Sequence, residues 1–446
     1  MATAAEAPPV AARPAGGSGF ARLPPGPRPG PLTNAGWIFR PLPLLERWRE
    51  RYGNTFTLKL AQEPPWVVLG DPQDVRAVFQ GDPSILHAGE GNQILLPILG
   101  RHSVLLLDDE RHLRQRKLML PPFHGERMQR HVETMAEAAR QEIERWPAGE
   151  AFPLHPHMQD VTLEVIMRVV FGETEDARSD DLRAGIKRFL EFGTDWKVFV
   201  RMAVLGNERL QRARFFRAAM DPVDAAIAGI IARRRAEPDL DGRDDVLSML
   251  VLSRHDDGTA MSDQELRDEL MTLLVAGHET TATALAWALE RLVRHPAMLD
   301  RLASGDEEYL DAVVTETLRR RPVVPLVLRK LTAPWELNGR LLPAGVAVSP
   351  NIHLVHHNPD VYPDPFAFRP ERFVGRQPGT YEWIPFGGGI RRCIGASFAV
   401  TEMRTVLAEV VRTVALRPAD PAPERVARRA ITWTPSSGAR VIAARR

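Results

Sequence analysis

The 446-residue chain has little cysteine, little net charge and no long hydrophobic runs. Its single cysteine excludes an intrachain disulfide and a zinc site made only of cysteines, and it fits a reducing compartment. The 58 Lys and Arg residues balance 57 Asp and Glu residues, which gives no support to nucleic-acid binding. No run approaches the roughly 18 apolar residues of a membrane span, and no signal peptide opens the sequence. We therefore expect a cytoplasmic protein without a membrane anchor.

The first 33 residues differ in composition from the rest of the chain. They are dominated by Ala, Pro and Gly and end in the proline-rich stretch Pro24–Pro31. Such a stretch lacks core-forming residues, so we expect residues 1–33 to be a flexible N-terminal segment that leads into a stiff, extended entry. Of the whole chain, 44% of the residues are hydrophobic, which is enough to fill a substantial core.

The pattern of apolar and turn residues predicts a mainly α protein with a minor β part. Helical patterns dominate between about residues 108 and 320, whereas residues 322–392 have the Gly and Pro content of strands and loops. The other elements that we expect are a strand pair at Thr55–Leu60 and Trp66–Leu69, a last helix from Ile394 to Val414, and a closing β hairpin around Pro435–Gly438.

One predicted helix is unusually long. Ser262 and Glu265 have the spacing of a capping box, and Pro296 marks the far end, so the helix could run for about 33 residues or ~50 Å. Its flanks are apolar nearly all round, which indicates burial. Its centre, residues 276–281, is Ala-Gly-His-Glu-Thr-Thr, a poor choice for a buried helix unless the polar groups serve chemistry or are satisfied locally. A zinc-protease H-E-x-x-H site is excluded, because Ala282 stands where the second histidine would be.

The only cysteine lies between a glycine-rich loop and a predicted amphipathic helix. Gly387, Gly388 and Gly389 permit tight turns, and Arg391 and Arg392 add positive charge beside Cys393. The loop, the helix N-terminus and the arginines all favour the thiolate and should lower the pKa of the thiol. A thiolate here is either a nucleophile or a metal ligand. The nucleophile lacks a histidine nearby in the sequence, and an inert buried cysteine is a poorer interpretation in this setting.

This loop fits the pattern F-x-x-G-x-R-x-C-x-G and resembles the haem-binding loop of the cytochrome P-450 haem-thiolate monooxygenases. Four other stretches resemble that family in its own order: His112–Arg116 (the H-x-x-x-R propionate clamp of bacterial members), Ala276–Thr280 (the oxygen-activating helix), Glu316–Arg319 (E-x-x-R) and Arg369–Phe373. E-x-x-R alone is weak, because any charged helix can contain it, whereas the cysteine loop is specific. The resemblance covers residues 34–446 and implies one cytochrome P-450 domain, with a long central helix across the haem and small β sheets.

The resemblance also implies the cofactor and its ligands. Haem b would be bound with the thiolate of Cys393 as its axial iron ligand. Phe386 would cover the sulfur, and N–H groups of the loop around Gly387 and Gly395 would tune the potential of the iron. The haem propionates would be bound by His112, Arg116, Arg329 and Arg391.

Further roles follow for the central helix and for the E-x-x-R segment. Ala276 and Gly277 would lie where the helix approaches the haem, and Glu279 and Thr280 would form the acid–alcohol pair that delivers protons during oxygen activation. Three residues would form a buried structural ion network rather than a catalytic group: Glu316, Arg319 and Arg372.

The function that the resemblance implies is the hydroxylation or epoxidation of an apolar small molecule that is terpenoid, steroid or fatty-acid-like. The enzyme would use O2 and electrons from separate proteins, a ferredoxin and its reductase, because one cysteine cannot hold an iron–sulfur cluster and no flavin domain follows. Arg114, Lys117 and Arg392 are candidates for docking an acidic ferredoxin, or are ordinary solvated charges. We expect a monomer.

Two other functions are open within the same fold. A peroxide-driven peroxygenase is the first, although such enzymes of this family lack the acid–alcohol pair that Glu279 and Thr280 form here. A non-enzymatic haem sensor or carrier is the second, but it gains nothing from such a pair. By analogy with the family, the substrate pocket would be lined by residues 85–105, 185–215, 270–281, 322–328 and 431–436, which include many apolar side chains.

Overall fold

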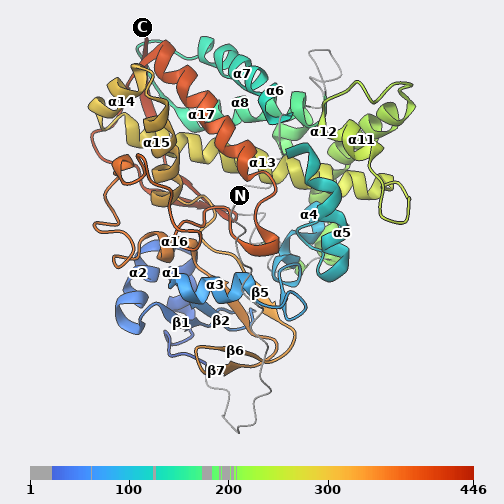
Figure 1. Cartoon of the computed structure of the whole chain (residues 1–446), viewed down its shortest axis with the longest axis vertical. Helices are drawn as coiled ribbons and strands as arrows, with labels where there is room; N and C mark the ends of the chain where they lie inside the picture. Colours follow the sequence, from blue (N-terminus) through green and yellow to red (C-terminus); the bar gives the residue numbers. More distant parts are fainter. Residues whose placement is uncertain are drawn as a thin grey trace, which may run out of the picture.

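The computed structural model describes residues 23–61, 63–123, 127–172, 183–189, 192, 201, 205–206 and 208–446. Helices fill the upper part of the molecule in Figure 1, while the main sheet and the first helices gather at its lower end. Helix α13 (Asp263–Leu292) crosses the upper part, and α17 (Ala396–Thr413) packs on it. The expected class, mainly α with small sheets, is confirmed.

The remaining helices follow one another in three groups along the chain. The first group consists of α1 (Pro31–Phe39), α2 (Pro41–Tyr52) and α3 (Pro72–Gln80). The second consists of α4 (Leu96–Leu99), α5 (Asp109–Met119), α6 (Arg127–Arg130), α7 (Val132–Glu144), α8 (Leu154–Val169), α11 (Arg214–Ala236) and α12 (Val246–Leu252). The third adds α14 (Pro296–Ala303), α15 (Glu307–Arg320) and α16 (Ile352–His356), and short 3-10 turns lie at η1 (Glu90–Leu95), η2 (Pro121–Phe123), η3 (Pro370–Arg372) and η4 (Gly389–Arg391).

Helix α13 is the long helix that the sequence predicts. The side chain of Ser262 accepts a bond from the Glu265 N–H, and the Glu265 side chain accepts one from the Ser262 N–H, which completes the capping box. The helix spans 30 residues rather than 33, because Pro296 excludes the helical conformation at His295, whose φ is −132° and ψ is 74°. Most of its residues are buried, and the largest hydrophobic cluster of the protein surrounds it.

The main sheet joins strands that are far apart in the sequence, in the order β1-β2-β8-β5-β3. Its strands are β1 (Thr55–Leu58), β2 (Trp66–Leu69), β3 (Leu86–His87), β5 (Arg329–Leu331) and β8 (Ala347–Pro350). The predicted pairing of β1 with β2 is confirmed and is antiparallel, although β1 ends two residues earlier than expected. β2 and β8 are parallel, and the remaining pairs are antiparallel.

The predicted closing hairpin around Pro435–Gly438 is wrong. The hairpin is formed instead by β10 (Val426–Arg429) and β11 (Thr432–Pro435), with its turn at residues 430–431. Residues 436–439 lead into β12 (Arg440–Arg445), which pairs with β4 (Ala151–Pro153) and β9 (Val414–Pro418) in another sheet. The Glu424 carboxylate accepts bonds from the N–H groups of Ser437 and Ala439, and this long-range contact fixes a turn that local sequence does not reveal. A separate two-stranded ribbon is formed by β6 (Trp335–Leu337) and β7 (Arg340–Leu342).

The N-terminal entry is packed from residue 23 onward. Leu23 contacts a hydrophobic cluster of the main sheet, and the Thr57 N–H donates to the carbonyl of Pro25 at 3.0 Å. Helix α1 begins at Pro31, a position where proline is favourable, so the boundary predicted after residue 33 falls inside a helix. Residues 1–22, for which we predict flexibility, lie outside the described residues.

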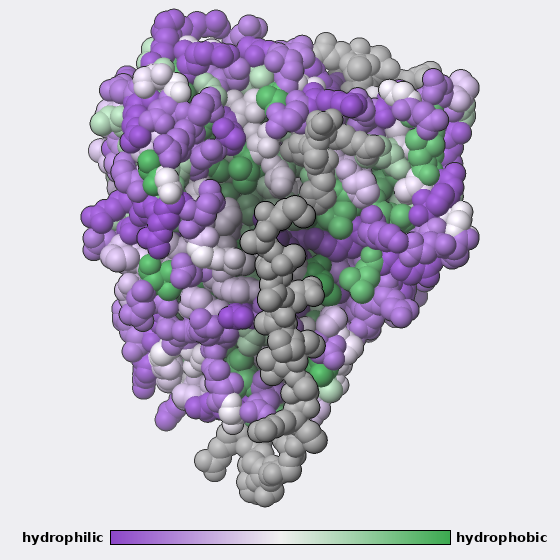
Figure 2. Space-filling model, in the orientation of Figure 1, coloured by the Kyte–Doolittle hydropathy of each residue, from purple (hydrophilic) through white to green (hydrophobic). Residues whose placement is uncertain are grey.

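The face of the molecule that is turned toward the viewer in Figure 1 is mostly hydrophilic, and apolar residues gather near its mid-height (Figure 2). Among the described residues, no helix combines the length and the apolar character that crossing a membrane requires.

A fully buried ion pair ties α15 to the segment before the cysteine loop. Arg319 donates to both carboxylate oxygens of Glu316, at 2.6 and 2.8 Å, and neither side chain is exposed. Arg319 also donates to the carbonyls of His356, Pro365 and Ala367. Arg372 lies 3.7 Å from Glu316, so the three residues expected to form the structural network do lie together.

Glu316→Gln is predicted to destabilise the protein strongly. The amide keeps the shape of the side chain but leaves the Arg319 charge buried without a counter-ion, and breaking a buried pair costs about 3–5 kcal/mol. Urea unfolding of the full chain followed by circular dichroism measures the change.

Glu307→Gln is the matched control, because Glu307 lies on the same helix but is 73% exposed and pairs with Arg404 at 3.0 Å. Exposed pairs of this kind contribute little. An equal loss of stability in the two variants would contradict the role of the buried pair.

Candidate active site

The cysteine loop has a backbone conformation that favours glycine at two points. Gly387 and Gly389 have φ values of +66° and +64°, in the left-handed region. A Cβ atom at Gly389 would lie 2.2 Å from the carbonyl oxygen of Phe79 in α3, so this glycine also allows the loop to pack on α3. The Cys393 N–H donates to the Phe386 carbonyl at 2.9 Å and closes the loop just before α17.

The side chain of Cys393 is accessible to solvent, yet many protein atoms lie around its thiol group. Burial raises the pKa of its thiol above the usual value, while an N–H bond from Gly395 and the charges of Arg116 and Arg392 lower it. Because desolvation is the largest of these effects, the expectation that the loop, the helix N-terminus and the arginines lower the thiol pKa is wrong for the protein groups taken without the metal. A coordinated metal ion would supply the missing stabilisation, since metal binding deprotonates a thiol outright.

The centre of α13 has one open face. Ala276 is exposed although the helix is buried on both sides of it, and Thr280, one turn later, is half-buried. Gly277 faces the other way, because a Cβ atom there would lie 3.3 Å from Ile166 of α8. The glycine thus serves the close packing of α8 on α13, and the expectation that the helix approaches the haem at this point stays a prediction.

Glu279 and Thr280 have different partners. The hydroxyl of Thr280 donates to the Ala276 carbonyl at 2.5 Å, on the open face of α13. Glu279 accepts a bond from Gln159 of α8 at 2.6 Å and lies 3.7 Å from Arg429 of β10. The acid therefore points toward α8 and β10, and the alcohol toward the open face.

Burial raises the pKa of Glu279 above its usual value, while Arg429, Gln159 and Thr283 act in the opposite direction. His155 lies 3.5 Å from Glu279, and burial lowers the pKa of His155 to about 3. Glu279 is thus a buried carboxyl whose pKa is raised by burial and partly lowered again by the polar groups around it on the α8 and β10 side of α13. Such tuning is usual for groups that hold or move protons.

The predicted propionate ligands meet in one basic cluster. His112 and Arg116 come from α5, Arg329 from β5, and Arg391 from η4. Burial, followed by the charges of Arg391, Arg116 and Arg329, lowers the pKa of His112 to about 3. The Nδ1 atom of His112 is buried without a hydrogen-bond partner.

Within the described part of the chain, Arg116 and Arg329 have no carboxylate partner and donate only to the carbonyls of Arg392 and Leu328. A basic cluster with an unpartnered imidazole nitrogen needs anions, and the two propionates of haem b are such anions. The exposed Cys393 can bind the iron, and the small Ala276 leaves room on α13. The residues present therefore fit haem b, while each assignment other than Cys393 stays a prediction.

Four of the five predicted pocket segments lie side by side. Ser103 accepts a bond from Thr272 of α13 at 2.7 Å, a Cβ at Gly91 would lie 3.2 Å from Cβ of Leu328, and the Trp433 N–H donates to the Val323 carbonyl at 2.8 Å. The fifth segment, residues 185–215, falls partly outside the described residues.

The basic residues considered for ferredoxin docking are not equivalent. Arg114 pairs with Asp257 at 3.1 Å and Lys117 with Asp256 at 2.5 Å, whereas Arg392 is exposed and has no carboxylate partner within the described residues. The charges of Arg114 and Lys117 are therefore neutralised by carboxylates of this protein itself.

Several residues of the site were not identified from the sequence. His356 accepts the Ile384 N–H at 2.8 Å and has its other ring nitrogen 3.1 Å from the Arg319 carbonyl, so it links the buried ion pair to the cysteine loop. Asp108 pairs with Arg391, and Gln159 and Arg429 contact Glu279. Only Asp108 carried a local signal, because it precedes His112 by four residues.

Comparison with known proteins agrees with this geometry. The family model described as Cytochrome P450 matches residues 24–439. A protein named "Putative cytochrome P450 135B1" from Mycobacterium tuberculosis is 45% identical over 430 residues, covering 94% of this chain and 91% of its own. "Putative cytochrome P450 138" from the same organism is 38% identical and covers 100% of this chain and 99% of its own.

The fold is shared with solved structures of lower identity. The structure of "Retinoic acid bound cyanobacterial CYP120A1" has a TM-score of 0.82 at 22% identity and covers 95% of this chain and 100% of its own. The haem domain of "cytochrome P450DA" has a TM-score of 0.80 at 21% identity, covering 95% of this chain and 98% of its own.

Members of the matched family bind haem b through a cysteine thiolate, and Cys393 is the only cysteine in the sequence. Cys393 is therefore the axial ligand of haem b in this protein. The chain belongs to the cytochrome P450 family and is a monooxygenase, an oxidoreductase that incorporates oxygen into its substrate.

Proposed function

We propose that this monooxygenase hydroxylates or epoxidises an apolar small molecule of terpenoid, steroid or fatty-acid-like character. The observation that carries the proposal is the apolar character of the side chains that stay half-exposed around the open face of α13. Leu273 and Val275 flank Ala276 on the helix, and Leu95 and Leu96 belong to the segment that packs against it. An apolar wall with few polar groups selects ligands by shape and by burial of apolar surface.

Electrons are proposed to come from a separate ferredoxin and its reductase. The chain's one cysteine binds the haem iron, so no thiolate is left within these 446 residues for an iron–sulfur cluster.

We also propose that the protein is cytoplasmic and monomeric. The lone cysteine, in a chain that cannot form an internal disulfide, supports a reducing compartment.

We propose that different residues of the site bind the propionates, surround the sulfur and handle protons. His112, Arg116, Arg329 and Arg391 bind the propionates, and Phe386, Gly387 and Gly395 shape the surroundings of the Cys393 sulfur. Glu279 delivers protons from the α8 side of α13, and Thr280 presents its hydroxyl on the open side, where the substrate would lie. When bound, the haem supplies the activation of O2, for which no amino-acid side chain suffices.

A peroxide-driven peroxygenase remains the second candidate. The presence of both Glu279 and Thr280, with the acid buried in a polar cluster, favours a protein that manages protons during oxygen activation. A sensor or carrier would have no use for this arrangement.

Cys393→Ser is predicted to abolish the haem-thiolate spectrum. Because no second cysteine exists, the reduced carbon monoxide complex of the variant should lose its red-shifted Soret band. Absorption spectra of the reduced protein with and without carbon monoxide measure the effect. An unchanged band would contradict the assignment of the axial ligand.

Thr280→Ala is predicted to separate electron use from product formation. The variant loses the hydroxyl on the open face of α13 but no buried packing, so folding and substrate affinity should change little. Because general acid–base groups contribute about 10²- to 10⁴-fold, product formed per NADPH should fall while NADPH oxidation continues. Product and NADPH are quantified in the same reaction.

Thr281→Ala is the matched control, because Thr281 is 4% exposed and points about 100° away around the helix. It should stay coupled. If Thr281→Ala uncouples and Thr280→Ala does not, the acid–alcohol assignment is wrong by one residue.

The substrate class and the electron source are tested together. A terpenoid, a steroid and a fatty acid are each added to the protein, and we expect at least one to shift the haem spin state. The shifting compound should stimulate NADPH oxidation only when a ferredoxin and its reductase are present. Turnover with NADPH and no partner would contradict the proposed electron source, and turnover with hydrogen peroxide alone would favour the peroxygenase.

A further inference from the structure

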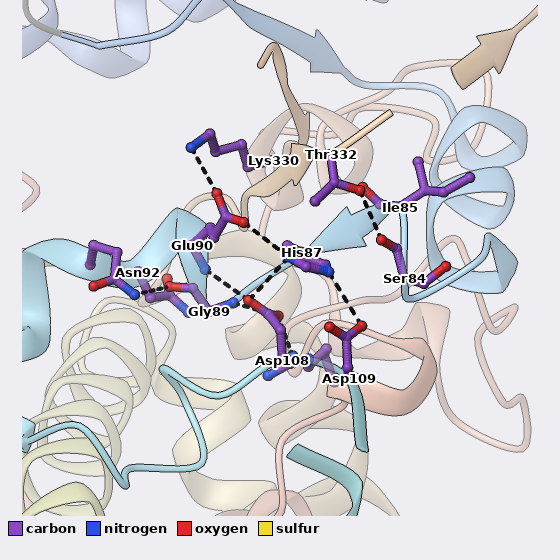
Figure 3. A network of polar contacts seen from close by, with 12 residues as sticks. Ser84, Ile85, His87, Gly89, Glu90, Asn92, Asp108, Asp109, Lys330 and Thr332 are labelled. Carbon is purple, nitrogen blue, oxygen red and sulfur yellow. Dashed lines mark hydrogen bonds and ion pairs between the residues drawn. The ribbon is translucent and has the colours of Figure 1, made fainter. Parts of the chain in front are cut away.

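A polar network outside the acid–alcohol pair surrounds Asp108, at the border between the main sheet and the cysteine loop. It joins His87 of β3, Glu90 of η1, Asp108 and Asp109 at the start of α5, and Lys330 of β5 (Figure 3). Asp108 lies at its centre and is only 12% exposed.

The Asp108 carboxylate closes a loop of the chain on itself. Its Oδ1 accepts the Gly89 N–H at 2.9 Å, and its Oδ2 accepts the Glu90 N–H at 3.0 Å. These two bonds fasten the beginning of the segment 89–108 to its end. The two ends of the segment, which we call its neck, lie very close together, because a Cβ at Gly89 would lie 2.4 Å from the Leu106 carbonyl oxygen.

The same carboxylate holds Arg391. The guanidinium donates to Asp108 Oδ1 at 2.5 Å and to the Val104 carbonyl at 3.3 Å. The far part of the segment is fixed to α13, where Glu269 accepts the Val104 N–H at 2.8 Å and Asp268 accepts the His102 N–H at 2.9 Å. The segment 89–108 therefore connects α13, which faces the substrate side, with an arginine two residues before the haem ligand.

Asp108 does not act as an ordinary helix cap. It occupies the N-cap position of α5, where aspartate usually accepts an N–H of the first turn, but its side chain makes no such bond. The carboxylate is turned back toward Gly89, Glu90 and Arg391 instead. The Asp108 side chain therefore binds these three residues instead of stabilising the N-terminus of α5.

The surrounding groups support this placement. His87 Nδ1 lies 3.1 Å from Glu90 and 3.7 Å from Asp108, and its Nε2 lies 3.3 Å from Asp109. Lys330 pairs with Glu90 at 2.7 Å. Both ends of the neck are thereby fixed to the strand pair β3–β5, which also carries Arg329 of the basic cluster.

We propose that Asp108 is a positioning residue that couples haem anchoring to the substrate-side segment 89–108, by holding Arg391 for a propionate and closing the segment with the same carboxylate. The proposal rests on the haem site but not on the substrate class or the electron source. Arg391 has five N–H donors, so the two bonds to Asp108 and Val104 leave others for the propionate.

The test uses haem-loaded full-length protein and the variant Asp108→Asn. Asparagine cannot pair with the arginine and accept both N–H groups, so both connections should weaken. Hydrogen exchange at Gly89 and Glu90, and haem transfer to apomyoglobin, should each become faster by about tenfold or more. Neither measurement depends on turnover.

Asp109→Asn is the matched control, since it makes the same charge change one residue away, at a side chain that is 52% exposed, pairs with His87 and makes no hydrogen bond to Arg391 or to the N–H groups of Gly89 and Glu90 among the described residues. It should change both rates less than about twofold. The proposal is overturned if Asp108→Asn leaves either rate like the wild type, or if Asp109→Asn has the same effect.

Arg391→Lys keeps the test decisive if Asp108→Asn cannot be isolated. The lysine retains the charge but is shorter and lacks the planar guanidinium, whose two separate nitrogens bond Asp108 and Val104, so exchange at Gly89 and Glu90 should also rise, although these residues are some 300 positions away in the chain. Unchanged exchange in this variant overturns the coupling. A wild-type protein without the red-shifted Soret band would instead contradict the haem-thiolate assignment.

Discussion

The burial of charge is the constraint on which this structure depends. Two buried sets of charged groups obtain their counter-charges in different ways. Glu316 and Arg319 neutralise each other completely, and the arginine satisfies its remaining N–H groups with carbonyls. The basic cluster around His112 is neutralised only in part: Asp108 pairs with Arg391, whereas Arg116 and Arg329 lack carboxylate partners within the described residues and one imidazole nitrogen has no partner. If the two carboxylates of haem b bind this cluster, as proposed, they would complete this second set, and haem b would be a structural partner of the fold as well as its reactive group.

The sequence was sufficient for the features that depend on local chemistry. The glycine-rich loop around Cys393, the capping box of α13 and the pairing of β1 with β2 are encoded by residues close together in the chain, and the structure confirms them. The long-range grouping of the four basic residues followed from the family resemblance rather than from spacing. It required that η4, β5 and α5 meet, which periodicity alone cannot establish.

The features that sequence reasoning missed are those in which a distant residue decides the outcome. The close contact of Ile166 in α8 with the position of Gly277 is one such feature, because nothing near Gly277 in the sequence indicates it. The turn at Pro435–Gly438 is held by Glu424 rather than by its own strands, so the hairpin was placed one strand too late. The thiol pKa was predicted from nearby positive charge, whereas desolvation by the whole fold outweighs it.

The position of the Cys393 sulfur is fixed from three sides. Helix α3 supports the loop through Phe79, the buried ion pair supports it through His356 and Ile384, and Arg391 leads to the segment 89–108 through Asp108. Each connection uses a different kind of contact: close backbone packing, a neutral histidine and a charged pair. The open face of α13 has no comparable polar anchoring of its own, and its exposed side chains are small or apolar. The molecule thus combines a rigid ligand loop on one side of the site with an apolar wall on the other. This is the arrangement that a fixed metal centre and a weakly polar substrate require, since the first needs exact ligand placement and the second needs only shape and burial.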